Sequence, residues 1–407
     1  MARRSIITGL DVGTTKVCTI IAECKEDGGL RVVGVGNVPS AGMHKGAVVN
    51  ISDAKESIRA SIKKAEQACN YKVESAYVGI TGRHVSSVNN RGEIAITRND
   101  RLVRADDLRR VLSSAQSVRI PSDRKLLHVI PRGYAIDGQD GVQNPVGMHG
   151  FKLDVETHII TTAITSVQNL MKCVRSLGVD IDDLVLEPVC SADAVLTEDE
   201  KQAGVVMADI GGGTTDIAVF KDGSIYHTAV LPVAGYQITR DVAIGLGLPF
   251  DVAEKMKKAY GSVMPVYEGK TQVPDPMSSD GHGASYQDLC EIIRARVEEI
   301  LRLVLLEMPH SEYQALVPAG LVLTGGGANI SGIDALAEQI WRLPVRVGSP
   351  NFEGISDSLR DPIFATAVGL VLWGNKNRTR PRINRLFGTG LFRFVGQIVR
   401  MFRQSLI

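Results

Sequence analysis

The octapeptide Asp209-Ile210-Gly211-Gly212-Gly213-Thr214-Thr215-Asp216 joins two apolar runs, 205–210 and 216–221. The two runs have the composition of β-strands, so the octapeptide is expected to form the turn between them. Three consecutive glycines are costly to order unless the backbone needs their conformational freedom. A loop that cradles phosphate groups is therefore favoured over a plain hairpin turn.

A second stretch of the same design, Gly9-Leu10-Asp11-Val12-Gly13-Thr14-Thr15-Lys16, lies near the start of the chain. Gly13 allows close backbone approach, Thr14 and Thr15 can donate amide and hydroxyl hydrogens to phosphate oxygens, and Lys16 adds a positive charge. We expect Asp11, with Asp209, to hold Mg²⁺ through water. Alone, this octapeptide also fits an ordinary hairpin, but two such loops from related domains can clamp one polyphosphate from opposite sides.

The segments around these loops repeat one pattern. Apolar runs separated by Gly-rich turns predict two antiparallel meanders, the first at 5–10, 17–23 and 30–38 and the second at 205–210, 216–221 and 224–233. A helix is predicted after each, from a Ser52 cap to Cys69 and from Gln237 onward, and another strand at 77–80. Asp11 and Asp209 each follow the first strand of their set, so an internal duplication is predicted.

Two further patterns point to the same site less strongly. A strand at 321–324 runs into Gly325, Gly326 and Gly327 before a helix at 333–341, which lets a flat base or a phosphate approach bare backbone at a positive helix end. Glu254 and Lys257 share one face of a helix, with Lys258 beside them. An ion pair on a solvated helix face is the alternative for this group.

Composition excludes several classes of protein. The chain has 407 residues, with 46 Lys and Arg against 45 Asp and Glu, so no global field attracts nucleic acid. Six cysteines without a C-x-x-C argue against a zinc site or a disulfide framework and fit a reducing cytoplasm. The first apolar run is interrupted at Asp11, too early for a signal peptide. The longest charge-free stretch, 313–333, contains Pro318 and repeated Gly, so we expect no membrane-spanning helix.

Residues 84–159 interrupt the repeated pattern and are interpreted as an inserted subdomain. We expect strands at 92–97 and 126–136, a charged helix at 105–115 and a Gly, Pro and Asn-rich stretch at 138–150. Residues 265–285 are rich in Pro, Gly, Ser and Asp, the composition of a surface loop, and are interpreted as a second boundary between parts of the chain.

The end of the chain differs in charge from the rest. No acidic residue follows Asp361, and eight basic residues lie between Lys376 and Arg403. At a helical period, one arc is apolar: Leu391, Phe392, Phe394, Val395, Ile398, Val399, Met401, Phe402 and Leu406. The opposite arc carries Arg393, Arg400 and Arg403, which favours a helix lying in the plane of a membrane over one docked on its own core.

These motifs, in their order along the chain, resemble the superfamily of actin, Hsp70 and the sugar kinases, and within it the FtsA family of bacterial cell-division proteins. The superfamily resemblance rests on residues 10–16, 186–188, 209–215, 254–258, 324–327 and 361–369. The resemblance to the FtsA family rests on residues 127–131, 144–147 and 196–200 and on the amphipathic C-terminus.

The resemblance implies an α/β fold with two duplicated domains around a nucleotide cleft, an inserted α+β subdomain and a C-terminal amphipathic helix. It implies the following division: 1–83, 160–193 and 358–375 as the core of domain 1, 84–159 as the insertion, 194–227 and 303–357 as the core of domain 2, 228–302 as small subdomain 2B, and 376–407 as basic linker and membrane helix. The implied phosphate loops are residues 11–16 and 209–215, and the implied adenosine loop is residues 325–327. The implied contacts to ribose or base are Glu254, Lys257 and Lys258. Glu187 stands where relatives place a residue that orients the attacking water. No residue beyond Glu187 has the character of a strong general base, so any ATP hydrolysis is expected to be slow.

The same resemblance implies partners and a location. The implied partners are the tubulin-like ring protein FtsZ, bound through residues 228–302, other copies of the chain in a filament, an anionic membrane surface, and later divisome proteins. The implied location is the cytoplasmic face of the membrane, at the division septum. Arg296 and Glu299, on a helix expected at 288–307, are the predicted FtsZ contacts, with a solvated helix face as the alternative. A pilus-type membrane-assembly actin homologue is the nearest alternative function, and a sugar kinase, which needs an acceptor site, is a more distant one. Kinase activity is not expected.

Overall fold

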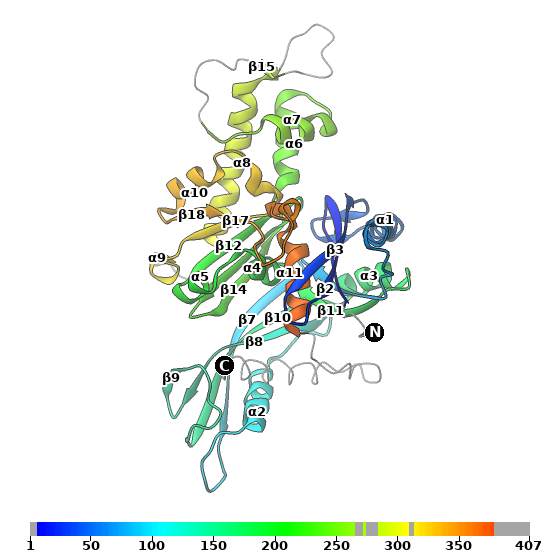
Figure 1. The fold of residues 1–407 in the computed structure, drawn as a ribbon. Helices are drawn as coiled ribbons and strands as arrows, with labels where there is room; N and C mark the ends of the chain where they lie inside the picture. Colours follow the sequence, from blue (N-terminus) through cyan, green and yellow to red (C-terminus); the bar gives the residue numbers. More distant parts are fainter. Residues whose placement is uncertain (1–5, 265–271, 274–283, 309–312, 378–407) are drawn as a thin grey trace.

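The computed structural model describes residues 6–264, 272–273, 284–308 and 313–377, and two five-stranded sheets with equivalent strand orders form its centre (Figure 1). The first has the order β11-β6-β1-β2-β3, with β1 Ile6–Val12, β2 Lys16–Cys24, β3 Leu30–Pro39, β6 Ser75–Ile80 and β11 Asp180–Leu186. The second has the order β18-β17-β12-β13-β14, with β12 Val205–Ile210, β13 Thr215–Lys221, β14 Ser224–Leu231, β17 Leu321–Thr324 and β18 Val345–Val347. The first strand of each set is antiparallel to the second and parallel to its other neighbour. The predicted duplicated α/β fold is confirmed.

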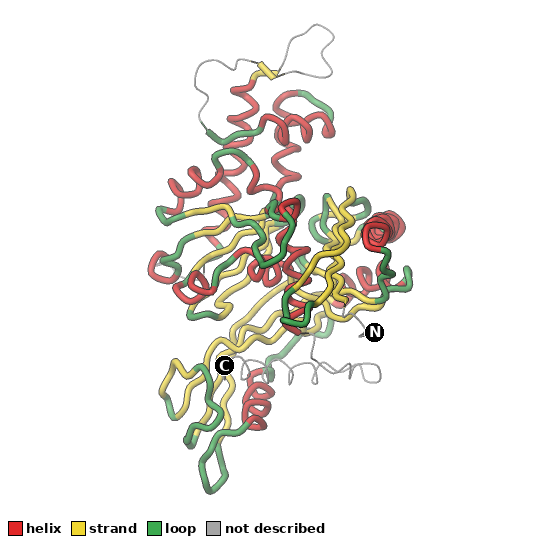
Figure 2. The backbone as a smooth tube through the Cα atoms, viewed as in Figure 1, coloured by secondary structure: helices red, strands yellow, loops and turns green. Residues whose placement is uncertain are grey.

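Helices cover both sheets, and their apolar faces fill the core. The first sheet packs against α1 Ile51–Cys69 and α3 Ile164–Arg175, and on its other side against α4 Glu187–Val195 and α11 Ala365–Asn377. The second sheet packs against α8 Tyr286–Leu306 and α10 Ile333–Trp341, with α6 Gly235–Leu246 and α7 Phe250–Tyr260 beyond them. The short helix α5 Glu198–Ala203 contacts β13, and the short helix α9 Tyr313–Leu316 packs on the same core as α8. Figure 2 shows that the lobe containing α7 is helical, whereas the opposite lobe is mostly strand and loop.

The last described helix, α11, returns to the first sheet and packs closely on α4 and β1. A Cβ on Gly369 would collide with the carbonyl group of Cys190, and a Cβ on Gly9 would press on Ala367 and Leu370. Glycine at these two positions therefore allows the helix to lie directly on its neighbours. The resulting apolar cluster includes buried residues of both sheets, so the two halves share one core.

The inserted segment forms its own sheet, of order β7-β10-β8-β9, with one helix against it. Its elements are β7 Val85–Ala95, α2 Ala105–Ala115, β8 Arg124–Ile136, β9 Gln139–Val142 and β10 Lys152–Ala163. Long strands run from the centre of the molecule into this lobe (Figure 1). The predicted strand at 92–97 is wrong in its bounds, because pairing with β10 extends β7 back to Val85. The stretch at 138–150, expected to be a loop, contains strand β9.

Three local predictions are also corrected. Helix α1 is capped by Asn50, whose Oδ1 accepts a hydrogen bond from the Ser52 amide at 3.0 Å, and Ser52 itself lies inside the helix. Strand β14 ends at Leu231 because Pro232 has no amide hydrogen for the ladder. Asp11 and Asp209 lie within the last residues of β1 and β12 and not after them.

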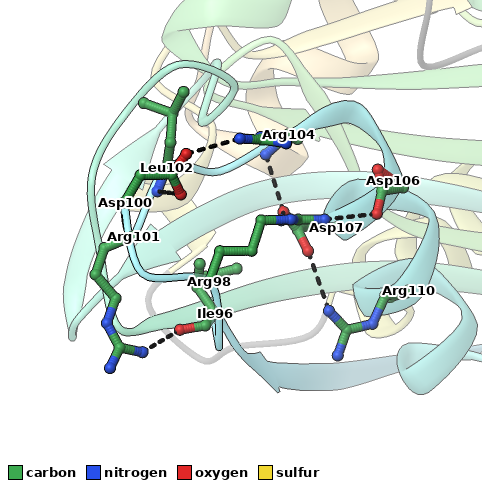
Figure 3. Close-up of polar contacts among 9 residues, drawn as sticks. All are labelled: Ile96, Arg98, Asp100, Arg101, Leu102, Arg104, Asp106, Asp107 and Arg110. Atoms are coloured by element: carbon green, nitrogen blue, oxygen red, sulfur yellow. Dashed lines mark hydrogen bonds and ion pairs between the residues drawn. The ribbon is translucent and has the colours of Figure 1, made fainter.

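The loop that leads into α2 is fixed by a cluster of arginines and aspartates (Figure 3). Asp107 is fully buried and accepts hydrogen bonds from the Arg104 amide at 2.9 Å and from Arg110 at 3.1 Å, and it pairs with Arg98. Arg98 also donates to Asp106 at 2.7 Å. Burial raises the pKa of Asp107, but the Arg104 amide and the Arg98 guanidinium more than offset this, so its pKa lies below the ordinary value.

We predict that Asp107→Asn destabilises the inserted subdomain by about 1–3 kcal/mol, because two arginines lose the carboxylate that pairs them. The wild-type contribution is present above the ordinary pKa of an aspartate and is lost as pH falls through the lowered folded value. Urea unfolding at neutral and acidic pH measures both effects.

Asp106→Asn is the matched control, since the Asp106 side chain is 46% exposed and pairs with the same Arg98 at 2.7 Å. It should change the free energy of unfolding by less than about 0.5 kcal/mol. Equal losses in the two variants would contradict a special role for the buried carboxylate.

Candidate functional site

The two glycine turns meet face to face at the centre of the molecule. Each turn is closed by its own backbone hydrogen bond, from the Gly13 amide to Lys16 at 3.0 Å and from the Gly211 amide to Thr214 at 2.9 Å. A Cβ on Gly212 would collide with Thr15, and a Cβ on Gly213 would collide with Thr14. The lack of side chains at these two glycines is therefore required by the facing turn, and it leaves backbone amides bare where a phosphate chain would lie.

Two buried aspartates lie at the base of the turns. Asp11 forms an ion pair with Lys16. Asp209 Oδ2 accepts hydrogen bonds from Ser191 at 2.7 Å and from Thr366 at 3.2 Å. Burial raises the pKa of Asp209, although the Ser191 hydroxyl and the Lys16 charge oppose this. Burial also disfavours the charge on Lys16, but the neighbouring Asp11 carboxylate outweighs it and raises the Lys16 pKa above its ordinary value.

Two more buried acids lie in the same region. Asp216 accepts hydrogen bonds from Thr81 and, at 2.9 Å, from Thr214, and burial together with the charge of Asp209 raises its pKa to about 7. Glu187, the first residue of α4, has a pKa well above the ordinary value because of its burial and the charges of Asp11 and Asp216. Glu187 also lines a cavity of about 10 Å³, room for a single water molecule.

This excess of buried carboxylate is suited to a hard divalent cation. Among the described residues, no three His, Cys, Asp or Glu side chains converge on one metal position. Asp11 and Asp209, at the base of the two turns, are the carboxylates that could hold such a cation through the cation's own water ligands.

The third glycine run lies beside the second turn. Strand β17 is parallel to β12, with Thr324 opposite Asp209. Gly325 has a φ of 79°, and a Cβ there would collide with the Asp209 carboxylate. Gly326 begins a 3₁₀ helix, Gly326–Asn329, and a Cβ on Gly327 would collide with Ile210. The backbone at 325–327 is thus packed directly against the carboxyl end of β12.

The predicted group on α7 reaches the second turn through α6. Glu254 pairs with Lys257 at 2.7 Å and with Lys258 at 3.0 Å. Lys257 Nζ also donates to the Gly235 carbonyl at 3.2 Å, and the Gly235 amide donates to Gly211 at 3.0 Å. Burial lowers the Lys257 pKa despite the charge of Glu254. Lys258 is exposed, as expected for an ion pair on a solvated helix face. Lys257 is not, so that alternative describes only part of the group of Glu254, Lys257 and Lys258.

Sequence reasoning missed the hydroxyls that hold the acids. Ser191 and Thr366 donate to Asp209, and Thr81 donates to Asp216. Thr366 lies inside the motif at 361–369, and Ser191 follows Glu187 by one helical turn. The sequence near each of these two residues could therefore have pointed to the site. Thr81 had none, because its partner is far away in the sequence.

The other predicted partner residues lie elsewhere. Arg296, on α8, forms ion pairs with Asp241 and Glu299 at the edge of a groove of about 390 Å³ between α6 and α8. The groove is lined by Asp241, Ile244, Gly245, Ile292, Ala295, Arg296 and Glu299. Ile244 is 70% exposed, so this face is partly apolar.

The predicted membrane residues, 391–403, lie outside the described residues. Within the part of the chain that the structure describes, no helix has the length and apolarity needed to span a bilayer.

Comparison with known proteins identifies close relatives. A family model described as "Cell division protein FtsA" matches residues 206–369, and another described as "SHS2 domain inserted in FTSA" matches residues 82–161. The "Cell division protein FtsA" of Pseudomonas aeruginosa strain PAO1 is 44% identical, covering 91% of this chain and 89% of the relative. The protein of the same name from Escherichia coli strain K12 is 36% identical, covering 92% and 91%.

Solved structures share the fold at low identity. A "PilM-PilN type IV pilus biogenesis complex" chain aligns with a TM-score of 0.65 at 16% identity, covering 92% of this chain and 99% of that one. MreB5 of Spiroplasma citri bound to ADP aligns with a TM-score of 0.56 at 15% identity, with the same coverage. These likenesses confirm the actin-like fold class.

We predict that, without nucleotide and metal, the free energy of unfolding falls as pH rises through about 7, because Asp216 must then be charged while buried. Asp216→Asn should remove this part of the pH dependence and stabilise the chain at pH 8 relative to wild type by roughly 1–4 kcal/mol. Chemical denaturation at pH 5.5 and pH 8 is the measurement.

Asp222→Asn, on the exposed turn after β13, serves as the control because asparagine tolerates its φ of 52°. It should follow the wild-type pH dependence. A wild-type pH dependence retained in Asp216→Asn would show that this carboxyl is ionised without cost.

Proposed function

Because the chain belongs to the FtsA family of actin-like cell-division proteins, we propose that it binds ATP with Mg²⁺ between its two glycine turns and anchors the FtsZ ring to the membrane as a filament. The observation that carries the nucleotide part is the contact of the two turns above buried carboxylates. The proposal includes the division of the chain into two domain cores, the insertion at 84–159, the small subdomain at 228–302 and the tail at 376–407.

Within this site, each group has one task. The amides of Gly212 and Gly213 and the hydroxyls of Thr14 and Thr15 bind phosphate oxygens, and Lys16 supplies a positive charge. The hydroxyls of Thr214 and Thr215 donate to Asp216 and to the Val233 carbonyl, so these two residues hold the second turn in shape. Asp11 and Asp209 hold the hydrated Mg²⁺, which neutralises phosphate and carboxylate charge when bound. Residues 325–327 lie against the adenosine, and Glu254, Lys257 and Lys258 contact ribose or base.

Hydrolysis in this site is slow. Burial, together with the charges of Asp11 and Asp216, raises the pKa of Glu187. Its carboxyl is assigned the role of orienting a water molecule through hydrogen bonds, and the site offers no other candidate for a strong general base among the described residues.

The groove between α6 and α8 is the proposed FtsZ site. It offers an exposed apolar side chain, Ile244, between the charged groups Asp241, Arg296 and Glu299. An apolar centre with a charged rim is typical of surfaces that bind a peptide segment of a partner. The location of this complex is the cytoplasmic face of the membrane at the septum, where later divisome proteins join it.

The membrane part of the proposal rests on the sequence of the tail. Three arginines, Arg393, Arg400 and Arg403, contribute roughly 3 kcal/mol near an anionic leaflet, and the apolar arc adds burial. The filament part is consistent with the fold, since MamK, whose solved assembly is titled a double helical filament, aligns with a TM-score of 0.52. The alternative function, a pilus-type membrane-assembly actin homologue, is supported only by the likeness of the fold to that of the PilM-PilN complex chain.

We predict that Asp209→Asn weakens binding of Mg²⁺-ATP by about 10–100-fold, because a neutral amide holds the hydrated cation less well. The variant keeps an acceptor for Ser191 and Thr366, so its fold should survive. Isothermal titration of wild type, Asp209→Asn and the surface control Asp222→Asn measures this. Undiminished affinity in Asp209→Asn would refute the cleft assignment.

We predict that Phe402→Glu lowers co-sedimentation with anionic vesicles by at least about tenfold, because a carboxylate then lies in the apolar arc. Arg400→Ala should cost only about 1 kcal/mol, and its effect should fade at high salt. Purified FtsZ added to the same mixtures should sediment with wild-type-coated vesicles and remain in solution with Phe402→Glu. Unchanged sedimentation of Phe402→Glu would contradict the membrane helix.

A further inference from the structure

Three aromatic rings form a chain from the first domain to the helical lobe. His44 meets the Tyr236 ring edge-on, with 5.9 Å between ring centroids, and Tyr236 lies 5.0 Å from Phe250. His44 belongs to the hairpin of β4 Met43–His44 and β5 Ala47–Val48, whereas Tyr236 is on α6 and Phe250 begins α7. Both centroid distances lie in the range where aromatic pairs attract each other. The chain of rings therefore links the two halves of the molecule.

The His44 side of this link is held by the first glycine turn. The two residues after His44 have φ angles of 48° and 75°, the left-handed pair that closes a two-residue hairpin tightly. The second of them, Gly46, donates its amide hydrogen to Thr14 Oγ1 at 3.1 Å. His44 is thus fixed, through one rigid turn, to a hydroxyl of the first phosphate loop.

The Tyr236 side is held by the second glycine turn. The Tyr236 amide donates to the Gly212 carbonyl at 2.7 Å. Gly212 is the residue that packs against Thr15. Each end of the His44–Tyr236 contact is therefore bonded to one phosphate loop, at the place where the loops touch.

We propose that His44, Tyr236 and Phe250 form an aromatic latch that holds the two phosphate loops together and slows the release of bound nucleotide. This proposal rests on the proposed nucleotide site. Separation of the loops moves the two bonded ends apart and breaks the ring contact, so the contact resists that movement. His44 and Tyr236 act as positioning residues through Thr14 and Gly212, and Phe250 supports the Tyr236 ring.

The latch lies at the surface and not in a core. His44 is exposed, and Tyr236 and Phe250 are 36% and 42% exposed. Removal of one ring leaves no buried cavity, so the fold is expected to tolerate it. The contact can therefore be tested separately from stability.

The test is stopped-flow release of a fluorescent ADP derivative, in the presence of Mg²⁺, from the full chain. Tyr236→Ala and His44→Ala should each increase the dissociation rate about 2- to 10-fold, the effect of one aromatic pair. The double variant should release nucleotide no faster than the faster single variant, because both changes break the same contact. Tyr236→Phe, which keeps the ring, should match wild type, as should Tyr260→Ala, an exposed tyrosine elsewhere on α7.

The two proposals fail in different ways. If wild type binds the fluorescent ADP but the single variants release it at the wild-type rate, or their effects multiply in the double variant, the latch is refuted and the nucleotide site stands. If wild type does not bind the derivative, the proposed nucleotide site fails, and the latch with it. Should Tyr236→Ala not fold, His44→Ala alone decides, since its effect is expected to be the same.

Discussion

The contact between Gly212 and Gly213 on one side and Thr15 and Thr14 on the other is the constraint on which the structure depends. It requires two separate sheets to present their first hairpins at the same point, and it requires the second hairpin to have no side chains there. Equivalent strand orders meet this requirement, because the same turn then occupies the same place in each half. The two halves are held in position by their shared apolar core and by the close packing of α11 on α4.

The carboxylates beneath this contact have an electrostatic cost. Burial, and in addition the repulsion among four neighbouring acids with one lysine between them, raises the pKa values of Asp209, Asp216 and Glu187. The hydroxyls of Ser191, Thr366 and Thr81 reduce the cost by donating hydrogen bonds to two of the acids. A bound divalent cation would reduce the cost further, because its charge would offset that of the carboxylates.

The sequence predicted the parts of this fold that depend on neighbours along the chain. The meanders at 6–39 and 205–231 could be read because each strand pairs with the next, so strand, turn and strand follow in one stretch. Helix α1 was predicted from its apolar period, but its cap was assigned to Ser52 because Ser52 and Asn50 are both good caps and only backbone geometry separates them. Thr81 was not predicted, since its role depends on Asp216, which a different sheet brings to it. The link from His44 to Tyr236 was missed for the same reason.

The inserted subdomain is also tied to the second half, although its chain leaves from the first. Ser87 Oγ donates to the Thr228 carbonyl at 2.9 Å, and Asn89 Nδ2 donates to the Tyr226 carbonyl at 3.2 Å, so β7 is fastened to β14. His158 lies buried between Asn89 and Thr228, and its burial lowers its pKa to about 3, which keeps the ring neutral and the hydrogen bonds intact at physiological pH. Strand β14 follows directly from β13, the strand that leaves the second glycine turn. Through β14 and β13 the insertion is therefore fastened to the second glycine turn, the same turn that meets the first domain at Thr14 and Thr15.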